Sequence, residues 1–452
     1  MSDIKKICET KKSSNGKFRI NFNQDYTSLS VANECGYKLF SILSANKVDE
    51  IFNSESNVDT KIAERLFGSS LVSVVITRES NKLKIVHFKK RTDICEFKYP
   101  KNILSVKMNR SRLVVCLKDS IYIHNIRDMK LLQSIKPLPD NVSGLITLSL
   151  NSHLAYPCSK ECGNIQIYDA GNLQPRILIE AHSTNIAAMN FSSTGSLLAT
   201  ASIKGTVIRV FCVRNGQRVM EFRRGVKRYA QIVSLNFSIC GNFVSVSSNT
   251  ETIHVFKIDQ KAKEAAEKRQ DKSALNESGD EEERTDERSG IMKAFSKAVE
   301  TLIPVSTMLY QDRAFAHVQL SEPGLRYTCV VAKLEKDLRL MVACEDGFLY
   351  IYNLDQNGGE CKLLKCHDLR GDYDITELNG NETSCESLNP PEVDLKNNEK
   401  IMTSPAFETS FAQIMKGKPV VDKQLSNVPV DVFPNNNVQM FDETNFPPMC
   451  QA

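Results

Sequence analysis

Apolar and polar residues alternate in short stretches along much of the chain, and these stretches end on an aromatic residue or a histidine. Such alternation predicts β-strands with one buried face. The terminal residues of seven stretches are Phe40, Phe88, His124, Tyr168, Phe211, Phe256 and Tyr352. They are separated by 48, 36, 44, 43, 45 and 96 residues. The first five intervals match a four-stranded propeller blade of about 40–45 residues. The pattern predicts an all-β fold, a seven-bladed β-propeller with one long loop inserted in blade six.

The fifth repeat shows its strands most clearly. Strand-like runs at 186–191, 197–202, 207–213 and 218–222 are separated by Ser-Thr-Gly, Lys-Gly and Asn-Gly turns. The chain has no Trp, so the Trp-Asp signature of typical WD repeats is absent and other aromatic residues or histidines take its place. The spacing is regular, and helical periodicity is absent before residue 260, so a sandwich or a solenoid fits the sequence less well than a propeller does.

Composition changes mark the limits of the repeats. We expect the propeller to span residues 17–370, after a flexible N-terminus at 1–16. Residues 371–452 are rich in Asn, Glu, Pro and Ser without a sustained period, which predicts a disordered C-terminal tail. Residues 259–312 form the inserted loop.

The inserted loop has two different halves. The first is highly charged and includes an acidic run at 280–287, which predicts little fixed structure. In the second, apolar residues recur at steps of three and four, which predicts an amphipathic helix at 290–303 whose apolar face includes Phe295, Leu302 and Ile303. The pattern alone leaves two interpretations open. The helix packs against the propeller, or it enters a lipid interface.

Charge and hydropathy narrow the class of protein. The 58 Lys and Arg against 54 Asp and Glu leave a net charge of +4, so extensive nucleic-acid binding is not expected, although a local basic patch is. The first residues, MSDIKKICET, lack the apolar core of a signal peptide. No apolar run approaches the roughly 18–20 residues that span a bilayer. We therefore expect a cytoplasmic protein whose membrane contact is peripheral.

The 14 cysteines are scattered, and most lie singly within strand-like runs. Two groups invite comparison with metal sites, Cys158 with Cys162 and Cys361 with Cys366 and His367. Neither has a second pair at the spacing of a zinc site. We expect reduced thiols in the core and neither a metal nor a cofactor.

A Phe-Arg-Arg-Gly element at residues 222–225 lies between two similar runs, LATASIKGTVIRVF and VSVSSNTETIHVF. Because neighbouring side chains of a strand point to opposite sides, Arg223 and Arg224 are expected to serve two different sites. Alignment of the aromatic anchors places Arg209 and His254 at equivalent positions. The hydroxyl residues and the histidine near these two positions are His182, Thr200, Ser202 and Thr206 in the first set, and Ser248, Thr250 and Thr252 in the second.

Each set combines cations, hydroxyls and a turn, which are the groups that an anionic phosphate requires. Exposed arginines and strand hydroxyls are also common without any function, but two matched sets around one arginine pair favour a double anion site. No run of exposed aromatic residues accompanies the arginines, so base recognition is not expected. The sequence shows no paired nucleophile and base, no paired acids and no phosphate loop. We therefore expect that the protein is not an enzyme.

These motifs, together with HNIRDMKLL at 124–132 and NFNQDYTSLSVANECGYKLFS at 21–41, resemble the PROPPIN family, and most closely its animal WIPI branch. The resemblance implies a seven-bladed propeller with two phosphoinositide sites on the rim of blades five and six. It implies that the ligands are phosphatidylinositol 3-phosphate and phosphatidylinositol 3,5-bisphosphate. It also implies recruitment to preautophagosomal and endosomal membranes, where autophagy proteins of the conjugation or lipid-transfer machinery are partners.

By this resemblance, site one would use His182, Thr200, Ser202, Gly205, Thr206, Arg209 and Arg223. Site two would use Arg224, Ser248, Thr250, Thr252 and His254, and Gly225 completes the arginine turn. The inserted loop matches the family's loop between the third and fourth strands of blade six, whose tip is implied to enter membrane. Because the acidic first half would bind lipid poorly, we place membrane insertion in residues 290–309, through Phe295, Leu302 and Ile303. The alternative that the residues leave open is a protein scaffold whose arginine pair binds an acidic protein segment.

A second basic cluster, Arg110, Arg112, Arg127 and Lys130, lies within the third repeat. In the WIPI branch the groove between blades two and three receives an acidic segment of the conjugation machinery, so these residues are candidates for that contact. Solvated turn charges are the other interpretation.

Overall fold

The computed structural model describes residues 17–370, apart from residues 55, 226–228, 260, 262–313, 321 and 323. The predicted flexible N-terminus, the tail at 371–452 and the helix at 290–303 lie outside the described residues. Phe295, Leu302 and Ile303 therefore lie outside them as well.

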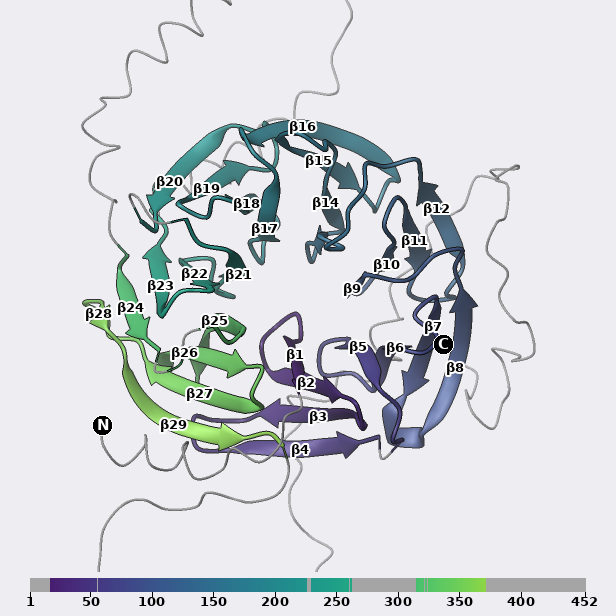
Figure 1. The fold of residues 1–452 in the computed structure, drawn as a ribbon, viewed down its shortest axis with the longest axis horizontal. Coiled ribbons are helices and arrows are strands. Elements are labelled where there is room, and N and C mark those ends of the chain that lie inside the picture. Colours follow the sequence, from purple (N-terminus) through teal and green to yellow (C-terminus); the bar gives the residue numbers. More distant parts are fainter. Residues whose placement is uncertain are drawn as a thin grey trace, which may run out of the picture.

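Seven antiparallel sheets form the blades of a ring around a central axis (Figure 1). Blade one consists of β1 (Arg19–Phe22), β2 (Ser28–Asn33), β3 (Gly36–Ile42) and β4 (Val48–Asn53). Blade two consists of β5 (Thr60–Arg65), β6 (Leu71–Ile76), β7 (Lys82–His87) and β8 (Thr92–Lys98), with a short 3-10 helix (Phe88–Lys90) before β8. Blade three consists of β9 (Ser105–Met108), β10 (Arg112–Cys116), β11 (Ile121–Asn125) and β12 (Leu131–Ile135).

The other four blades follow in chain order. Blade four consists of β13 (Thr147–Leu148), β14 (His153–Pro157), β15 (Gly163–Asp169) and β16 (Gln174–His182). Blade five consists of β17 (Ile186–Phe191), β18 (Leu197–Ser202), β19 (Val207–Cys212) and β20 (Arg218–Arg223). Blade six consists of β21 (Ile232–Phe237), β22 (Phe243–Ser248), β23 (Thr252–Lys257) and β24 (Ala316–Gln319). Blade seven consists of β25 (Tyr327–Leu334), β26 (Asp337–Cys344), β27 (Phe348–Asn353) and β29 (Lys362–Asp368), and β28 (Gly359–Glu360) pairs in parallel with β24 of blade six.

The predicted seven-bladed architecture is confirmed, and so is its repeat. Each of the seven aromatic or histidine anchors lies in the third strand of its blade, or directly after it in the case of Phe88. The anchors are buried because the blades pack face to face, and blade six, for example, shares one apolar cluster with blade five and another with blade seven. The four strands predicted in blade five agree with the structure to within one residue at each end.

Side-chain packing between blades seven and one closes the ring among the described residues. Ile20 and Phe40 of blade one share a buried cluster with Val330 and Met341 of blade seven. The backbone N–H of Phe18 also donates to the carbonyl of Glu345 at 2.9 Å. Each blade consists of its own four consecutive strands, and β28 from the chain of blade seven is added to blade six.

Blades five and six are joined by a continuous apolar cluster. Its centre is a stacked pair, Phe222 and Phe256, with ring centroids 5.0 Å apart and 1% of each residue exposed. Full burial of a large apolar side chain contributes about 1.5–3 kcal/mol, and the aromatic pair adds about 0.5–1.5 kcal/mol. The strand that carries Phe222 inward therefore places Arg223 outward on a rigid support.

Successive turns of a blade alternate between the two faces of the ring, because its strands are antiparallel. We call the face with the second turn of each blade, such as β18–β19 and β22–β23, the second-turn face. The connection from one blade to the next lies on this face too. The opposite face, with the first and third turns, is the first-turn face.

The insertion separates the third and fourth strands of blade six, as expected, because β23 ends at Lys257 and β24 begins at Ala316. Both ends therefore emerge on the first-turn face, where the Lys257 ammonium lies 5.3 Å from the centre of the Phe315 ring. No helix among the described residues is long and apolar enough to cross a membrane.

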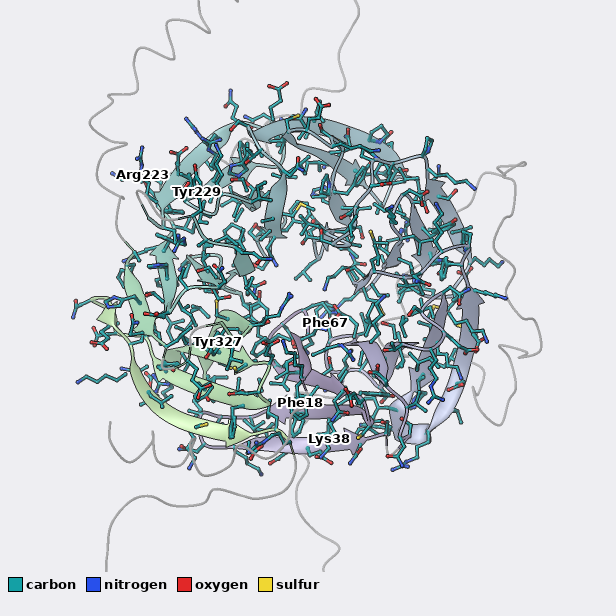
Figure 2. The ribbon with its side chains drawn as sticks, in the orientation of Figure 1. Phe18, Lys38, Phe67, Arg223, Tyr229 and Tyr327 are labelled. Atoms are coloured by element: carbon teal, nitrogen blue, oxygen red, sulfur yellow. The ribbon has the colours of Figure 1, made fainter. Side chains whose placement is uncertain are left out.

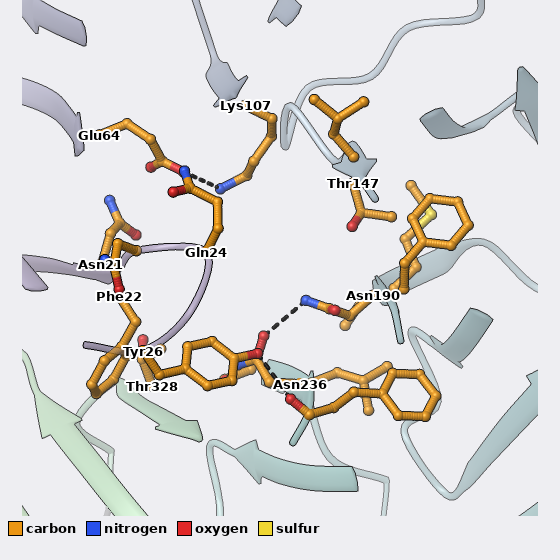
Figure 3. Close-up of a pocket in the computed structure, with 18 of the residues that line it drawn as sticks. Asn21, Phe22, Gln24, Tyr26, Glu64, Lys107, Thr147, Asn190, Asn236 and Thr328 are labelled. Carbon is orange, nitrogen blue, oxygen red and sulfur yellow. Dashed lines mark hydrogen bonds and ion pairs between the residues drawn. The ribbon is translucent and has the colours of Figure 1, made fainter. Parts of the chain in front are cut away.

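The innermost strands surround a polar cavity of about 740 Å³ on the axis of the ring (Figure 3). Two ion pairs lie within its wall, Lys107 with Glu64 at 3.1 Å and Lys17 with Glu345 at 3.9 Å. Asn190 donates to Asn236 at 2.9 Å, and the Tyr26 hydroxyl donates to the carbonyl of Phe237 at 2.9 Å. These bonds link different blades along the cavity wall, so the wall contributes to the rigidity of the ring.

Candidate functional site

The arginine pair occupies the connection between blades five and six on the second-turn face. Arg223 is the last residue of β20, lies opposite Val207 of β19 and is exposed at the rim of the ring (Figure 2). The backbone N–H of Arg224 donates to the carbonyl of Thr206 at 2.9 Å, so the backbone at Arg224 stays bonded to the end of the β18–β19 turn. The pair is thus fixed by the edge of blade five.

Arg224 reaches toward blade six. Its Nε donates to the carbonyl of Gly205 at 2.7 Å, and its Nη1 lies 3.5 Å from Oγ1 of Thr250. Gly205 has a φ of +62°, in the left-handed region that favours glycine. A Cβ atom at this position would collide with the carbonyl oxygen of Ala230. Glycine at 205 therefore sets the turn that holds Arg224.

Site one lies where blade four meets blade five. His182 is the last residue of β16, and its Nε2 lies 2.9 Å from Oγ1 of Thr200 on β18. The Thr200 hydroxyl donates to the carbonyl of Arg209 at 3.3 Å, so it accepts its other bond from Nε2 of His182. Thr200 is fully buried. The buried Thr200 hydroxyl therefore fixes the orientation of the His182 imidazole.

The charge state of His182 follows from this setting. Burial, followed by the nearby Arg209 guanidinium, lowers the pKa of His182 to about 4. The imidazole is therefore neutral at pH 7, and the positive charge of site one comes from its arginines. Ser202 is buried at the end of β18, and Thr206 is half-buried at the end of the β18–β19 turn, directly before β19.

Arg209 is held by an acidic residue that sequence analysis did not identify. Its Nε donates to Oε2 of Glu221 at 2.9 Å, and its Nη1 donates to the carbonyl of Ala181 at 2.8 Å. Arg218 contacts the same carboxylate oxygen at 2.8 Å. Glu221 lies two residues before Arg223, so strand alternation alone could have placed both on the same face.

Site two lies on the corresponding part of blade six. The hydroxyls of Ser248 and Thr250 are 2.7 Å apart across the β22–β23 turn, next to Arg224. Thr252 donates to Oε1 of Gln319 at 3.1 Å. His254 lies opposite His317 of β24. Burial, followed by the charges of Arg224 and His317, lowers the pKa of His254 to about 4.

Gln319 and His317 complete site two from β24, beyond the insertion, and sequence analysis missed both. The anchor pattern located only third strands, so it gave no register for β24. Arg209 and His254, in contrast, are the third residues of β19 and β23. Their predicted equivalence is therefore confirmed.

The second basic cluster lies on the first-turn face, opposite the arginine pair. The Arg110 guanidinium lies 4.8 Å from the centre of the Phe67 ring of blade two. Arg112 donates from Nε to the carbonyl of Ala170 at 2.6 Å, in blade four. Lys130 approaches Asp128 at 4.0 Å, and Arg127 is exposed.

The four residues of the cluster therefore share a face, and two of them contact different neighbouring blades. Arg110 borders blade two, whereas Arg112 is anchored to blade four. In the described part of the chain, no group of three or more His, Cys, Asp or Glu is arranged to hold a metal ion. His367, one of the residues compared with a metal site, instead lies with Nε2 2.9 Å from the carbonyl of Ala45.

Known proteins share both the sequence and this architecture. The sequence profile of the PROPPIN family matches residues 18–370. The chain belongs to the PROPPIN family. The match covers every described blade, including the arginine turn and both polar sets.

Relatives from several animals are similar over most of the chain. WD repeat domain phosphoinositide-interacting protein 2 of Gallus gallus is 47% identical over 357 residues, covering 78% of each chain. WD repeat domain phosphoinositide-interacting protein 1 of Homo sapiens is 46% identical over 367 residues, covering 80% of this chain and 79% of the relative. Autophagy-related protein 18 of Caenorhabditis elegans is 34% identical over 378 residues, covering 80% and 88%.

Solved structures agree in fold. Kluyveromyces lactis Hsv2 superimposes with a TM-score of 0.60 at 19% identity, covering 78% of this chain and all of the other. A structure described as the complex of KlAtg21 with the coiled-coil of AgAtg16 gives a TM-score of 0.58 at 26% identity, covering 78% and 99%.

Proposed function

We propose that this PROPPIN protein binds phosphatidylinositol 3-phosphate and phosphatidylinositol 3,5-bisphosphate through sites one and two. In this proposal it is a non-enzymatic effector, recruited peripherally to forming autophagosomal and endosomal membranes. The names of its relatives, phosphoinositide-interacting and autophagy-related, support this function. The observation that carries it is the pair of hydroxyl- and histidine-containing sets, one on each side of Arg223 and Arg224.

The chemistry of the two sets suits a phosphomonoester. Arginine gives charge-assisted, bidentate hydrogen bonds to phosphate, and hydroxyls add directional neutral bonds. Arg209 is oriented by Glu221 and Ala181, and Arg224 by Gly205 and Thr250. Because these guanidinium groups are ordered before a ligand arrives, less conformational entropy is lost when the phosphate binds.

Two sites on one rigid support also explain how sites of modest affinity can keep the protein bound to a membrane. The Phe222–Phe256 stack fixes blade five to blade six, so both sites meet the same bilayer. Once one headgroup is bound, the second site sees a high effective concentration of lipid. The apparent affinity for vesicles therefore exceeds that of either site alone.

Vesicle flotation tests the proposal. Arg223→Thr with Arg224→Thr is expected to abolish binding to vesicles that contain phosphatidylinositol 3-phosphate. Arg223 is exposed, so its replacement should change the free energy of unfolding by under about 0.5 kcal/mol. Arg127→Thr with Lys130→Thr removes the same charge from the first-turn face and is the matched control. Equal flotation of both double variants would contradict the proposal and leave an acidic protein segment as the ligand of the pair.

We propose a second contact on the first-turn face, where an acidic protein segment would meet Arg110, Arg127 and Lys130. The complex of KlAtg21 with a coiled-coil supports a protein partner for this fold. Arg112 holds the blade-four turn through Ala170 and Gly171, so we assign it a positioning role. Lipid and protein would then occupy opposite faces and bind independently.

A further inference from the structure

Two exposed apolar side chains lie on the second-turn face beside the arginine pair. Tyr229 is 70% exposed and Ile203 is 56% exposed. Tyr229 is the only exposed aromatic side chain among the residues that the structure describes. Figure 2 shows it in the same sector of the ring as Arg223. The exposed ring and Ile203 together place apolar surface directly beside a cationic site.

Backbone hydrogen bonds fix these side chains relative to the site. Ala230, next to Tyr229, donates to the carbonyl of Lys204 at 3.1 Å, and Lys204 directly follows Ile203. The next residue, Gly205, accepts the bond from Arg224 Nε at 2.7 Å. The β18–β19 turn therefore connects the apolar pair to Arg224, because it bonds to Ala230 through Lys204 and to Arg224 through Gly205. The side chain of Lys204 is itself exposed.

The composition of this surface matches the interface of a bilayer. Tyrosine has an apolar ring and a polar hydroxyl, and such rings are enriched at the level of lipid headgroups. Cations beside it are attracted to anionic lipid. A site that grips a headgroup brings the bilayer surface to its own rim, so the side chains that surround it must meet that surface.

The insertion begins on the other face. Thr252 starts β23 on the second-turn face, and Lys257 ends it on the first-turn face. Six residues of strand separate the two faces by about 20 Å. The apolar pair is therefore the described hydrophobic surface that lies nearest to the arginines and does not depend on the inserted loop.

We propose that Tyr229 and Ile203 form an interfacial anchor that inserts among the lipid headgroups when sites one and two hold their phosphoinositides. Lys204 attracts the anionic surface beside them. The inference rests on the proposed function, because the headgroup sites orient this edge toward the bilayer. It adds a contact with the bilayer itself, made by the rigid blade connection.

The anchor predicts a specific loss. Tyr229→Ser should weaken binding to vesicles that contain phosphatidylinositol 3-phosphate about tenfold, since partial burial of a large ring is lost. Ile203→Ser combined with Tyr229→Ser should weaken it further. Binding of soluble inositol 1,3-bisphosphate, measured by calorimetry, should not change.

Salt dependence is a second test, because burial of apolar groups is not screened by salt. The wild type and the single variant should therefore lose affinity by the same factor when the salt is raised to about 0.5 M, so that the difference between them persists.

The control is Val142→Ser, because Val142 is 72% exposed in the connection between blades three and four. It should bind vesicles and soluble headgroup like the wild type. Thermal unfolding should be unchanged in all variants, because each altered side chain is exposed.

The outcomes separate the two proposals. Unchanged vesicle binding by the Ile203→Ser, Tyr229→Ser variant would overturn the anchor and leave the headgroup sites standing. Equal losses of vesicle and soluble-headgroup binding would also overturn it, since the residues would then serve the phosphate site. Failure of the wild type to bind either ligand would instead overturn the proposed function.

Discussion

Replacing Thr200 with valine tests how site one is built. Thr200 is fully buried, and its hydroxyl joins Nε2 of His182 to the carbonyl of Arg209. Valine has nearly the same shape but no hydroxyl. Thr200→Val therefore removes both hydrogen bonds, and it leaves a buried polar nitrogen on His182 without this partner.

The structure sets the size of the effect. Leaving a buried polar group unsatisfied costs about 1–3 kcal/mol, so the free energy of unfolding should fall by an amount in this range. At site one, the imidazole loses a hydrogen bond that contributes about 0.5–1.5 kcal/mol to its orientation. The affinity for soluble headgroup should then fall about two- to tenfold at that site. Site two shares no residue with this hydrogen-bond chain and should be unaffected.

Urea denaturation and calorimetric titration with inositol 1,3-bisphosphate measure the two effects. Thr200→Ser keeps the hydroxyl and is the matched control, expected to bind like the wild type with a smaller loss of stability. The reasoning would be refuted if Thr200→Val and Thr200→Ser bound the headgroup equally well. It would be refuted equally if valine left the unfolding free energy unchanged.

Three further predictions address charge, backbone and partner. Because the folded pKa values of His182 and His254 are about 4, below the ordinary 6.5, the unfolded chain binds more protons between these values, and the free energy of unfolding should fall as the pH drops from 6.5 to 4. A double His→Gln variant should show a shallower fall in urea denaturation, and an identical slope would contradict the assignment. Gly205→Ala should lower both unfolding free energy and vesicle binding, since its Cβ collides with Ala230; normal values for both would show that the turn is not required. Arg110→Glu should weaken capture of an acidic peptide partner while flotation stays normal, and a parallel loss of flotation would show that the faces are not independent.

Sequence reasoning located the repeat because burial follows it. Anchors such as Phe211 and Phe256 are buried where blades pack, so the seven-blade count and the position of the insertion were predictable from apolar spacing alone. The fifth strand of blade six was not predictable, because β28 reaches β24 from the connecting loop of blade seven. Such a contact leaves no local pattern.

The candidate site was predictable only where its residues repeat. Arg209 and His254 occupy the same position in two blades, so alignment of the anchors found them. Glu221 was missed although alternation places it on the same face as Arg223, because a carboxylate is not expected in an anion site. His317 became a neighbour of His254 only through the register of β24. The sequence also grouped Arg110 with Arg112, whereas their side chains contact different blades.

The central claim is that Arg223 serves one phosphate site and Arg224 another. Calorimetric titration of the full chain with soluble inositol 1,3-bisphosphate measures the number of sites directly. The account predicts two bound headgroups for the wild type, one for Arg223→Thr, one for Arg224→Thr and none for the double variant. A wild type that binds a single headgroup, or a single variant that loses all binding, would contradict it.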